Sequence, residues 1–155
     1  MTNQSAIDAL VELLEGMADA TGAPLFGLVV GNRPDVAYVE QATYHRADVA
    51  PLSWTTDPKL VPGRIAVVLS FEVILTTALS NTPLEEPEGT IDQLVEQVTA
   101  EVNGADLGDT CVATQTRITD GRYFQYGKKA RILTPSPTRN ERRVWLYGSI
   151  TWLRD

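Results

Sequence analysis

The sequence predicts an α+β fold: a single domain in which two amphipathic α-helices pack on one face of a mostly antiparallel mixed β-sheet. Three observations predict it. Two segments carry apolar residues at helical spacing, several others are β-branched or alternate between apolar and polar, and the 155 residues suffice for one core. Helices that share one side of a sheet define this class. The composition, 43% hydrophobic and 21% charged, is typical of a globular protein.

The first helix is expected over Ser5–Asp19, because apolar residues recur there on one face. They are Ile7, Leu10, Val11, Leu14, Met17 and Ala18. Ser5 and Asp8 resemble a capping box, with Asp in place of the usual Glu. Gly22 and Pro24 follow the last periodic residue and are expected to end the helix.

The second helix is expected over 90–104, in the stretch TIDQLVEQVTAEVNG. Thr90 and Gln93 have the spacing of a capping box. An apolar stripe follows, and Asn103 with Gly104 is expected to close the helix. Its members are Ile91, Leu94, Val95, Val98 and Val102.

Strands are expected over Pro24–Val30 and Val36–Tyr44. Between them and the next strand, His45–Gly63 contains three prolines, so it is interpreted as a long loop. Trp54 and Leu60 within it are large and apolar. The loop is therefore expected to be ordered and to pack on something.

The run Arg64–Leu79 is rich in β-branched residues and is expected to be a strand. At about 3.3 Å per residue it would extend about 50 Å, which predicts a bend, a bulge or a projecting arm. Its odd positions are all apolar and form the expected core face. Glu72 falls on the mixed face with Val68 and Ile74, which faces either water or another subunit.

A hairpin is expected over Cys111–Gly127, with Asp120–Gly121 at its turn. Residues 128–133, KKARIL, are expected to continue its second strand. A terminal strand is expected over Arg142–Asp155, with large apolar groups on both faces, so it is central or packs against a neighbour. Val144, Leu146, Ile150 and Trp152 share one face, and Trp145, Tyr147 and Leu153 share the other.

Charge is distributed unevenly along the chain. Residues 1–116 carry 17 acidic and four basic residues, a net charge of −13, whereas residues 117–155 carry nine basic and three acidic residues, a net charge of +6. The two segments either meet within one subunit or form oppositely charged surfaces that meet between subunits, head to tail. A basic nucleic-acid surface ranks below both, because the bases form no stripe and the whole chain is acidic.

No catalytic motif is found: there is no phosphate-binding glycine loop, no nucleophile elbow and no zinc-protease motif. With one cysteine, Cys111, and one histidine, His45, the sequence predicts no metal site, no cofactor and no thiol chemistry. No membrane span is expected either. Trp54, Trp145 and Trp152 are expected in core or interface packing rather than in stacking on bases or sugars. A small enzyme or ligand-binding domain stays as the alternative class, which a concave pocket with perturbed carboxylates would favour.

The order of elements resembles the tail terminator, or tail completion, family of long-tailed bacteriophages. The helix IDALVELLEGMADA is followed by PDVAYVEQATY, the long strand AVVLSFEVILTTAL, the helix TIDQLVEQVTAEV, a hairpin and the final strand VWLYGSITWLRD. The resemblance covers nearly the whole chain as a pattern of elements. The expected loop 45–63 is longer than the family pattern.

The resemblance implies a structural, non-enzymatic virion protein, assembled in the host cytoplasm, that forms a hexameric ring at the tail–neck junction. The ring would end polymerisation of the tail tube, contact the tail tube protein and a neck or connector protein, and let DNA pass through its lumen. A related neck, head-completion or tail-tube protein of similar fold stays as an alternative. The interface or lumen candidates are Trp54, Glu72, Ile74, Arg142, Arg143, Trp145 and Tyr147. Glu72 is expected in the lumen or opposite an arginine such as Arg142 or Arg143 of another subunit.

Overall fold

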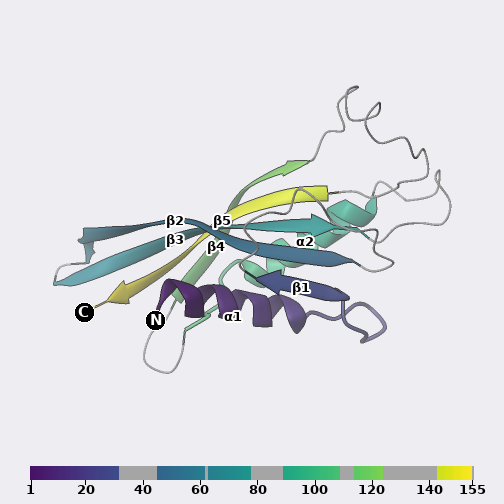
Figure 1. The fold of residues 1–155 in the computed structure, drawn as a ribbon, viewed down its shortest axis with the longest axis horizontal. Coiled ribbons are helices and arrows are strands. Elements are labelled where there is room, and N and C mark those ends of the chain that lie inside the picture. Colours follow the sequence, from purple (N-terminus) through teal and green to yellow (C-terminus); the bar gives the residue numbers. More distant parts are fainter. Residues whose placement is uncertain (32–44, 62, 78–88, 109–113, 124–142, 155) are drawn as a thin grey trace.

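The computed structural model describes residues 1–31, 45–61, 63–77, 89–108, 114–123 and 143–154. Within these ranges the elements are α1 (Asn3–Glu15), β1 (Leu28–Gly31), β2 (Arg46–Val61), β3 (Arg64–Thr76), α2 (Gly89–Val102), β4 (Thr114–Tyr123) and β5 (Arg143–Arg154). The strands form one sheet in the order β1-β2-β3-β5-β4, parallel only between β1 and β2. The α+β class is confirmed (Figure 1).

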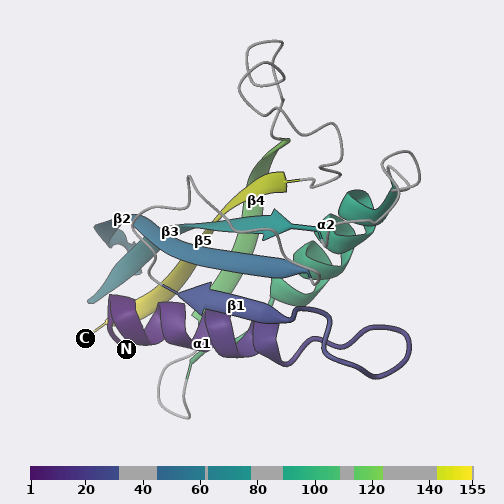
Figure 2. The same cartoon turned by 45° about the vertical axis from the view of Figure 1, so that its right-hand side comes forward.

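Both helices cover the same face of the sheet, here called the core face. α1 packs under β1 and β2, and α2 lies toward β4 and β5 (Figure 2). The buried cluster takes Ile7, Leu10 and Leu14 from α1 and Leu94 and Val98 from α2. Alternate strand residues complete it, among them Val49, Val67, Leu69, Phe71, Val73, Leu75, Val144, Leu146, Ile150 and Trp152. The opposite side of the sheet is called the outer face.

α1 starts two residues before the predicted position. Thr2 is the N-cap: its hydroxyl accepts a hydrogen bond from the backbone N–H of Ser5 at 3.0 Å, and the Ser5 hydroxyl accepts one from the N–H of Thr2 at 2.9 Å. The predicted capping box of Ser5 with Asp8 is therefore wrong, because Ser5 is the N3 residue of a capping box whose N-cap is Thr2. The helix also ends earlier, at Glu15, with Gly16 as its C-cap.

α2 is confirmed with a small shift at its start. It begins at Gly89, so Thr90 lies in the first turn rather than at the N-cap, within the usual scatter of helix ends. It ends at Val102, and Gly104 has a φ of 80°. That positive φ is the conformation that favours glycine after a helix, as the Asn103–Gly104 pair predicts.

The expected loop 45–63 is wrong: residues 46–61 form strand β2, which pairs with β3. The prolines do not prevent this, because beyond Val49 no described strand pairs with the other edge of β2. Proline lacks only an N–H, so it is tolerated on an edge strand and at irregularities. The pairing slips between Pro51 and Ser53, leaving Leu52 as the extra residue, and again between Asp57 and Val61.

β3 confirms the predicted long strand and its core face. Its odd positions from Val67 to Leu75 are buried, and Glu72 lies on the outer face. The predicted irregularity is on the partner strand β2. The two strands form a long ribbon whose tip extends past the start of α1 (Figure 1).

The predicted turn at Asp120–Gly121 is wrong, because strand β4 includes both residues and continues to Tyr123. The dipeptide follows a bulge, where the pairing with β5 shifts between Ile118 and Asp120. β5, twelve residues long, supplies a continuous partner there, and this ladder prevails over the local turn preference. The predicted strand 36–44, Cys111 and the predicted continuation past Gly127 lie outside the described residues.

β5 confirms the predicted terminal strand, and of the two expected positions it takes the central one, since β3 and β4 pair with its two edges. β1 is shorter than predicted and begins at Leu28. The preceding Leu25 and Phe26 are buried in the core instead. No helix among the described residues is long and apolar enough to cross a membrane.

Candidate functional site

The outer face around Glu72 is built by four strands in register. Glu72 of β3 lies opposite Ala50 of β2 and Tyr147 of β5, and Tyr147 lies opposite Asp120 of β4. The next row is Asp48, Ile74, Trp145 and Arg122, in the same strand order. Because directly paired residues share a face, these side chains form one surface.

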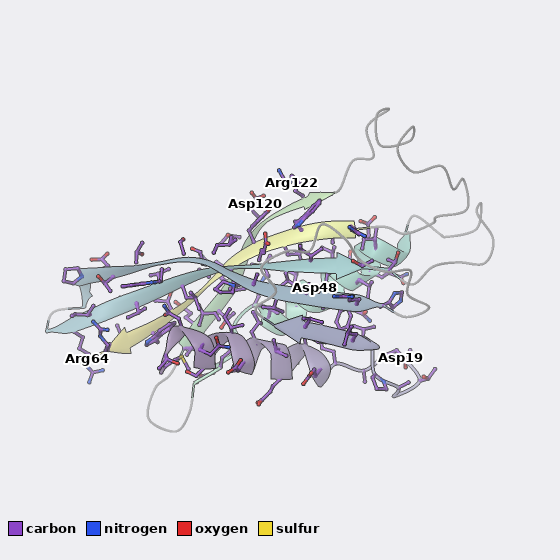
Figure 3. All side chains as sticks on the ribbon, viewed as in Figure 1. Asp19, Asp48, Arg64, Asp120 and Arg122 are labelled. Carbon is purple, nitrogen blue, oxygen red and sulfur yellow. The ribbon has the colours of Figure 1, made fainter. Side chains whose placement is uncertain are left out.

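Arg122 connects the two rows. Its Nη2 donates a hydrogen bond of 3.5 Å to the Tyr147 hydroxyl, and its guanidinium lies 5.4 Å from the centroid of the Trp145 ring. Such a cation–π contact contributes about 0.5–1 kcal/mol at an exposed site. Figure 3 shows Arg122 and Asp120 on the side of the sheet away from α1. Arg122 is thus a member of this surface that the sequence analysis missed, because Asp120–Gly121 was interpreted as a turn.

Glu72 is half-buried on the outer face of the sheet. This position explains why a carboxylate is tolerated in so apolar a strand. Desolvation raises the pKa of Glu72, and the positive charge of Arg122 lowers it in part. Within the subunit Arg143 lies opposite Thr76, and among the described residues Arg122 is the cation whose charge acts on Glu72. A contact of Glu72 with Arg143 of another subunit stays a prediction. Arg142 lies outside the described residues.

The remaining predicted residues differ in exposure. Trp145 and Tyr147 are half-buried on the outer face. Ile74 is only 2% exposed, so it has almost no surface left for a partner. Trp54 is 59% exposed on β2, so it does not pack in the core of its own subunit, and its packing in an interface stays a prediction. A strand that pairs on one edge only leaves this side chain without covering neighbours.

A buried ion pair lies at the β2 end of the outer face. Arg46 donates to both carboxylate oxygens of Asp48, at 2.9 Å from Nε and 2.8 Å from Nη2. Both side chains are less than a tenth exposed. Residues two apart on a strand share a face, so strand geometry brings Arg46 and Asp48 together. The sequence analysis did not predict this pair because it interpreted the segment as a loop. Paired charges of this kind are costly to break one at a time.

A polar hollow of about 510 Å³ lies at the β4 end of the outer face. It is lined by Asn103, Gly104, Gln115, Thr116, Arg117, Ser149 and Thr151. Arg117 lies opposite Ser149, and Gln115 lies opposite Thr151. Hydroxyl, amide and guanidinium groups therefore converge on one concave surface that contains no carboxylate. Sequence alternation along β4 could have placed Gln115 and Arg117 on one face.

The two edges of the sheet differ. The outer edge of β4 is closed by the segment after α2. The N–H of Gly104 donates to the carbonyl of Thr116 at 2.9 Å, and Asn103 Oδ1 accepts from the N–H of Ile118 at 2.7 Å. Asp106 Oδ1 accepts from the N–H of Thr114 at 2.8 Å. These bonds occupy backbone groups of Thr114, Thr116 and Ile118 that an added strand would need along the first half of β4.

The edge of β2 is open by comparison. No described strand pairs with it after Val49, and the side chains from Pro51 to Pro58 are all exposed. It carries two of the large exposed apolar residues among the described ones, Leu52 and Trp54. Exposed apolar groups on an unpaired strand edge are typical of sites that join other chains.

The described residues contain no cluster of three or more metal-ligating side chains. The groups that the outer face and the β2 edge present suit contact with another chain. They are the backbone of β2 where no described strand pairs with it, and guanidinium, hydroxyl and half-buried aromatic side chains. Surfaces rich in Tyr, Trp and Arg are typical of protein interfaces.

No known family's sequence model matches the chain, and no curated protein matches it. Solved structures do share its fold. One is a chain of the "virion of native gene transfer agent (GTA) particle", with a TM-score of 0.54 and 16% identity over 95% of this chain and 93% of that chain. Another is the "sheath/tube terminator in extended state" of an extracellular contractile injection system, with a TM-score of 0.55 and 13% identity.

The second similarity covers 99% of this chain and 56% of that chain, so this chain spans about half of the terminator's length. The first description names a virion, and the second names the sheath/tube terminator of a contractile injection system. The tail terminator resemblance inferred from the order of elements is therefore confirmed as a resemblance in fold.

Proposed function

We propose that this chain is a structural, non-enzymatic subunit that forms a ring at the head-proximal end of a phage-like tail tube. The ring, hexameric as the family resemblance implies, ends tube polymerisation and joins the tail to the neck, and DNA passes through its lumen. The subunit is assembled in the host cytoplasm and resides in the virion at the tail–neck junction.

One observation carries the proposal: nearly the whole chain shares its fold with a sheath/tube terminator. The distribution of charge supports it, because closed rings need two different, complementary surfaces on each subunit. Among the described residues, Arg117 and Arg154 have no ionic partner, nor have Glu12 and Glu15 of α1. Charges left uncompensated in the subunit are available to a neighbouring one. The net negative charge suits a DNA conduit, since it repels phosphate.

A second candidate has one observation in its favour. The gene transfer agent match is described by the whole virion rather than by one component. Another neck, head-completion or tube subunit of the same fold is therefore the runner-up. Imaging of particles with a tag on the chain distinguishes the two, since a terminator appears once, at the top of the tube.

The ring is tested by the mass of the protein in solution and by imaging, both alone and after mixing with the tail tubes of its particle. We expect a single ring at one tube end and no further growth of that end. A protein that stays monomeric in both conditions, or tubes that keep growing in its presence, would contradict the proposal.

Adjacent residues on opposite faces of β3 separate folding from assembly. Glu72→Lys is expected to leave the subunit folded and to disturb assembly, because residue 72 lies on the outer face. Phe71→Lys is expected to unfold the subunit, because Phe71 is fully buried and an unpaired charge there is costly. Circular dichroism and sedimentation measure the two effects, and equal unfolding of both variants would contradict the assignment of residues 71 and 72 to different faces.

A further inference from the structure

Arg117 is an exposed cation of β4 without a hydrogen-bonding or ionic partner among the described residues. It belongs to the basic C-terminal segment of an acidic chain. Arg122 of the same strand differs, since it contacts Tyr147 and Trp145. The free guanidinium lies at the rim of the 510 Å³ hollow, where the opposite residue is Ser149.

The side chains that line the hollow have the chemistry that a carboxylate requires. Gln115, Arg117, Ser149 and Thr151 all provide side-chain donors, and no acidic residue lines it. The amide nitrogen of Asn103 adds another donor, because Asn103 already uses its Oδ1 to accept from Ile118. Arginine with neighbouring hydroxyl groups is a typical environment for a charge-assisted hydrogen bond to a carboxylate.

A free anion is expected to bind weakly there. The hollow includes Gly104, just past the end of α2, and a helix C-terminus carries a partial negative charge. A carboxylate held in place by a larger contact does not depend on its concentration in solution. The occupant is therefore expected to be an acidic side chain of a protein surface.

The same chain carries a surface of the matching charge. Asp8, Glu12 and Glu15 are exposed on α1 at spacings of four and three residues, so they form one stripe on the side away from the core. This set is called the α1 acidic stripe. Glu12 and Glu15 have no partner among the described residues, and Asp8 contacts only the uncharged Gln4.

The stripe and the hollow belong to different strands' neighbourhoods. α1 packs on β1 and β2, whereas the hollow is lined by β4, the other edge strand in the sheet order. Among the described residues of one subunit Arg117 pairs with neither Glu12 nor Glu15, but successive subunits can join two different surfaces of this kind. We propose that the α1 acidic stripe of one subunit places a carboxylate in the Arg117 hollow of a second copy. The proposal rests on the ring of the proposed function and names its contact.

The test is a charge exchange between the two surfaces. Arg117→Glu, and separately Glu12→Lys with Glu15→Lys, are expected to raise the apparent Kd of each subunit contact about tenfold or more, because like charges then face each other. All three changes combined are expected to restore assembly. Arg154→Glu is the control: Arg154 is also exposed and without a partner, but it lies outside the hollow.

Assembly is measured by sedimentation of the protein alone, or on tail tubes if the protein alone is monomeric, with the melting of each variant as a check of folding. Restoration by the combined exchange, with Arg154→Glu near wild type, supports the contact. Wild-type assembly of Arg117→Glu, or no restoration, overturns the contact and leaves the ring intact. A wild-type protein that assembles in neither setting overturns the ring and the contact together.

Discussion

The two edge strands of the sheet differ in how the backbone groups on their outer sides are paired. The backbone of β4 is hydrogen-bonded to Asn103, Gly104 and Asp106 between Thr114 and Ile118, whereas no described strand pairs with the outer edge of β2 beyond Val49. An open edge invites another strand, and natural proteins usually blunt it. On β2 the blunting is partial: Pro51 and Pro58 bracket a six-residue window, 52–57, that contains no proline. Among the described strands, the difference indicates that strand addition is permitted at one edge, over a short length, and prevented along 114–118 at the other.

The closed edge depends on a close approach of β4, β5 and the core at Gly148. A Cβ at this position would lie 2.3 Å from the carbonyl oxygen of Arg117 and 2.6 Å from Cζ of Phe71. We expect Gly148→Val to lower the free energy of unfolding by about 3 kcal/mol or more, measured by urea denaturation. Gly16→Ala is the matched control, because its nearest neighbours would be at ordinary contact distances of 3.5 Å or more. An unchanged Gly148→Val protein would show that β4 is not tightly held.

Asp106 is the clamp at the start of β4. Its Oδ1 accepts from the N–H of Thr114 at 2.8 Å, the N–H of Gly108 at 3.0 Å and the Thr114 hydroxyl at 3.2 Å. Asp106→Ala is expected to destabilise the protein less than Gly148→Val does, and to speed hydrogen exchange mainly in β4. Asp19→Ala is the control, since Asp19 makes three similar bonds in the turn after α1. Equal exchange in β4 for both variants would contradict a local clamp.

The same clamp predicts a dependence on acid pH. Hydrogen bonds from Thr114 and Gly108 lower the pKa of Asp106 below its ordinary value of 3.8. A lowered folded-state pKa gives stability that is present above pH 3.8 and is lost as pH falls through the lowered value. Asp106→Ala is therefore expected to differ from wild type in melting temperature at neutral pH and to approach it in strong acid. A constant difference down to low pH would indicate that the charge is not involved.

The open edge is expected to matter little to the isolated subunit. Leu52→Thr with Trp54→Thr should change the free energy of unfolding by about 0.5 kcal/mol or less, because both side chains are more than half exposed. Assembly or attachment to tubes should weaken, as measured by sedimentation. Leu28→Thr is the control, since Leu28 is exposed on β1 rather than on this edge. Normal assembly of the double variant would remove β2 from the candidate surfaces.

The smallest effect on stability is expected for a change of Glu72, which lies on β3, between the two edge strands. Desolvation raises the pKa of Glu72 above 4.5, so the folded state holds its proton more tightly than the unfolded state. Stability from this group is present at low pH and falls as pH rises through the raised value. Glu72→Gln is expected to remove this decline and to stabilise the monomer at pH 7 by less than about 0.5 kcal/mol. A loss of monomer stability at pH 7 would show that the charge is favourably paired.

The sequence by itself determined the parts of the fold whose signal is periodic and local. The apolar stripes located both helices, and alternation assigned Phe71 to the core face and Glu72 to the outer face. The two faces of β5 and its central position followed from the same rule. Each of these depends only on the geometry of one element, so no neighbour was needed to predict it.

Only the tertiary structure decided where a local preference conflicts with a long partner. Three prolines favoured a loop at 45–63, and Asp120–Gly121 favoured a turn, yet both segments are strands. β3 and β5 extend far enough to pair with them, and the ladder of backbone hydrogen bonds outweighs the preferences of a few residues. The surfaces for assembly, including Arg117 and Arg122, come from residues distant in sequence that the sheet order brings into register, which no single segment can reveal.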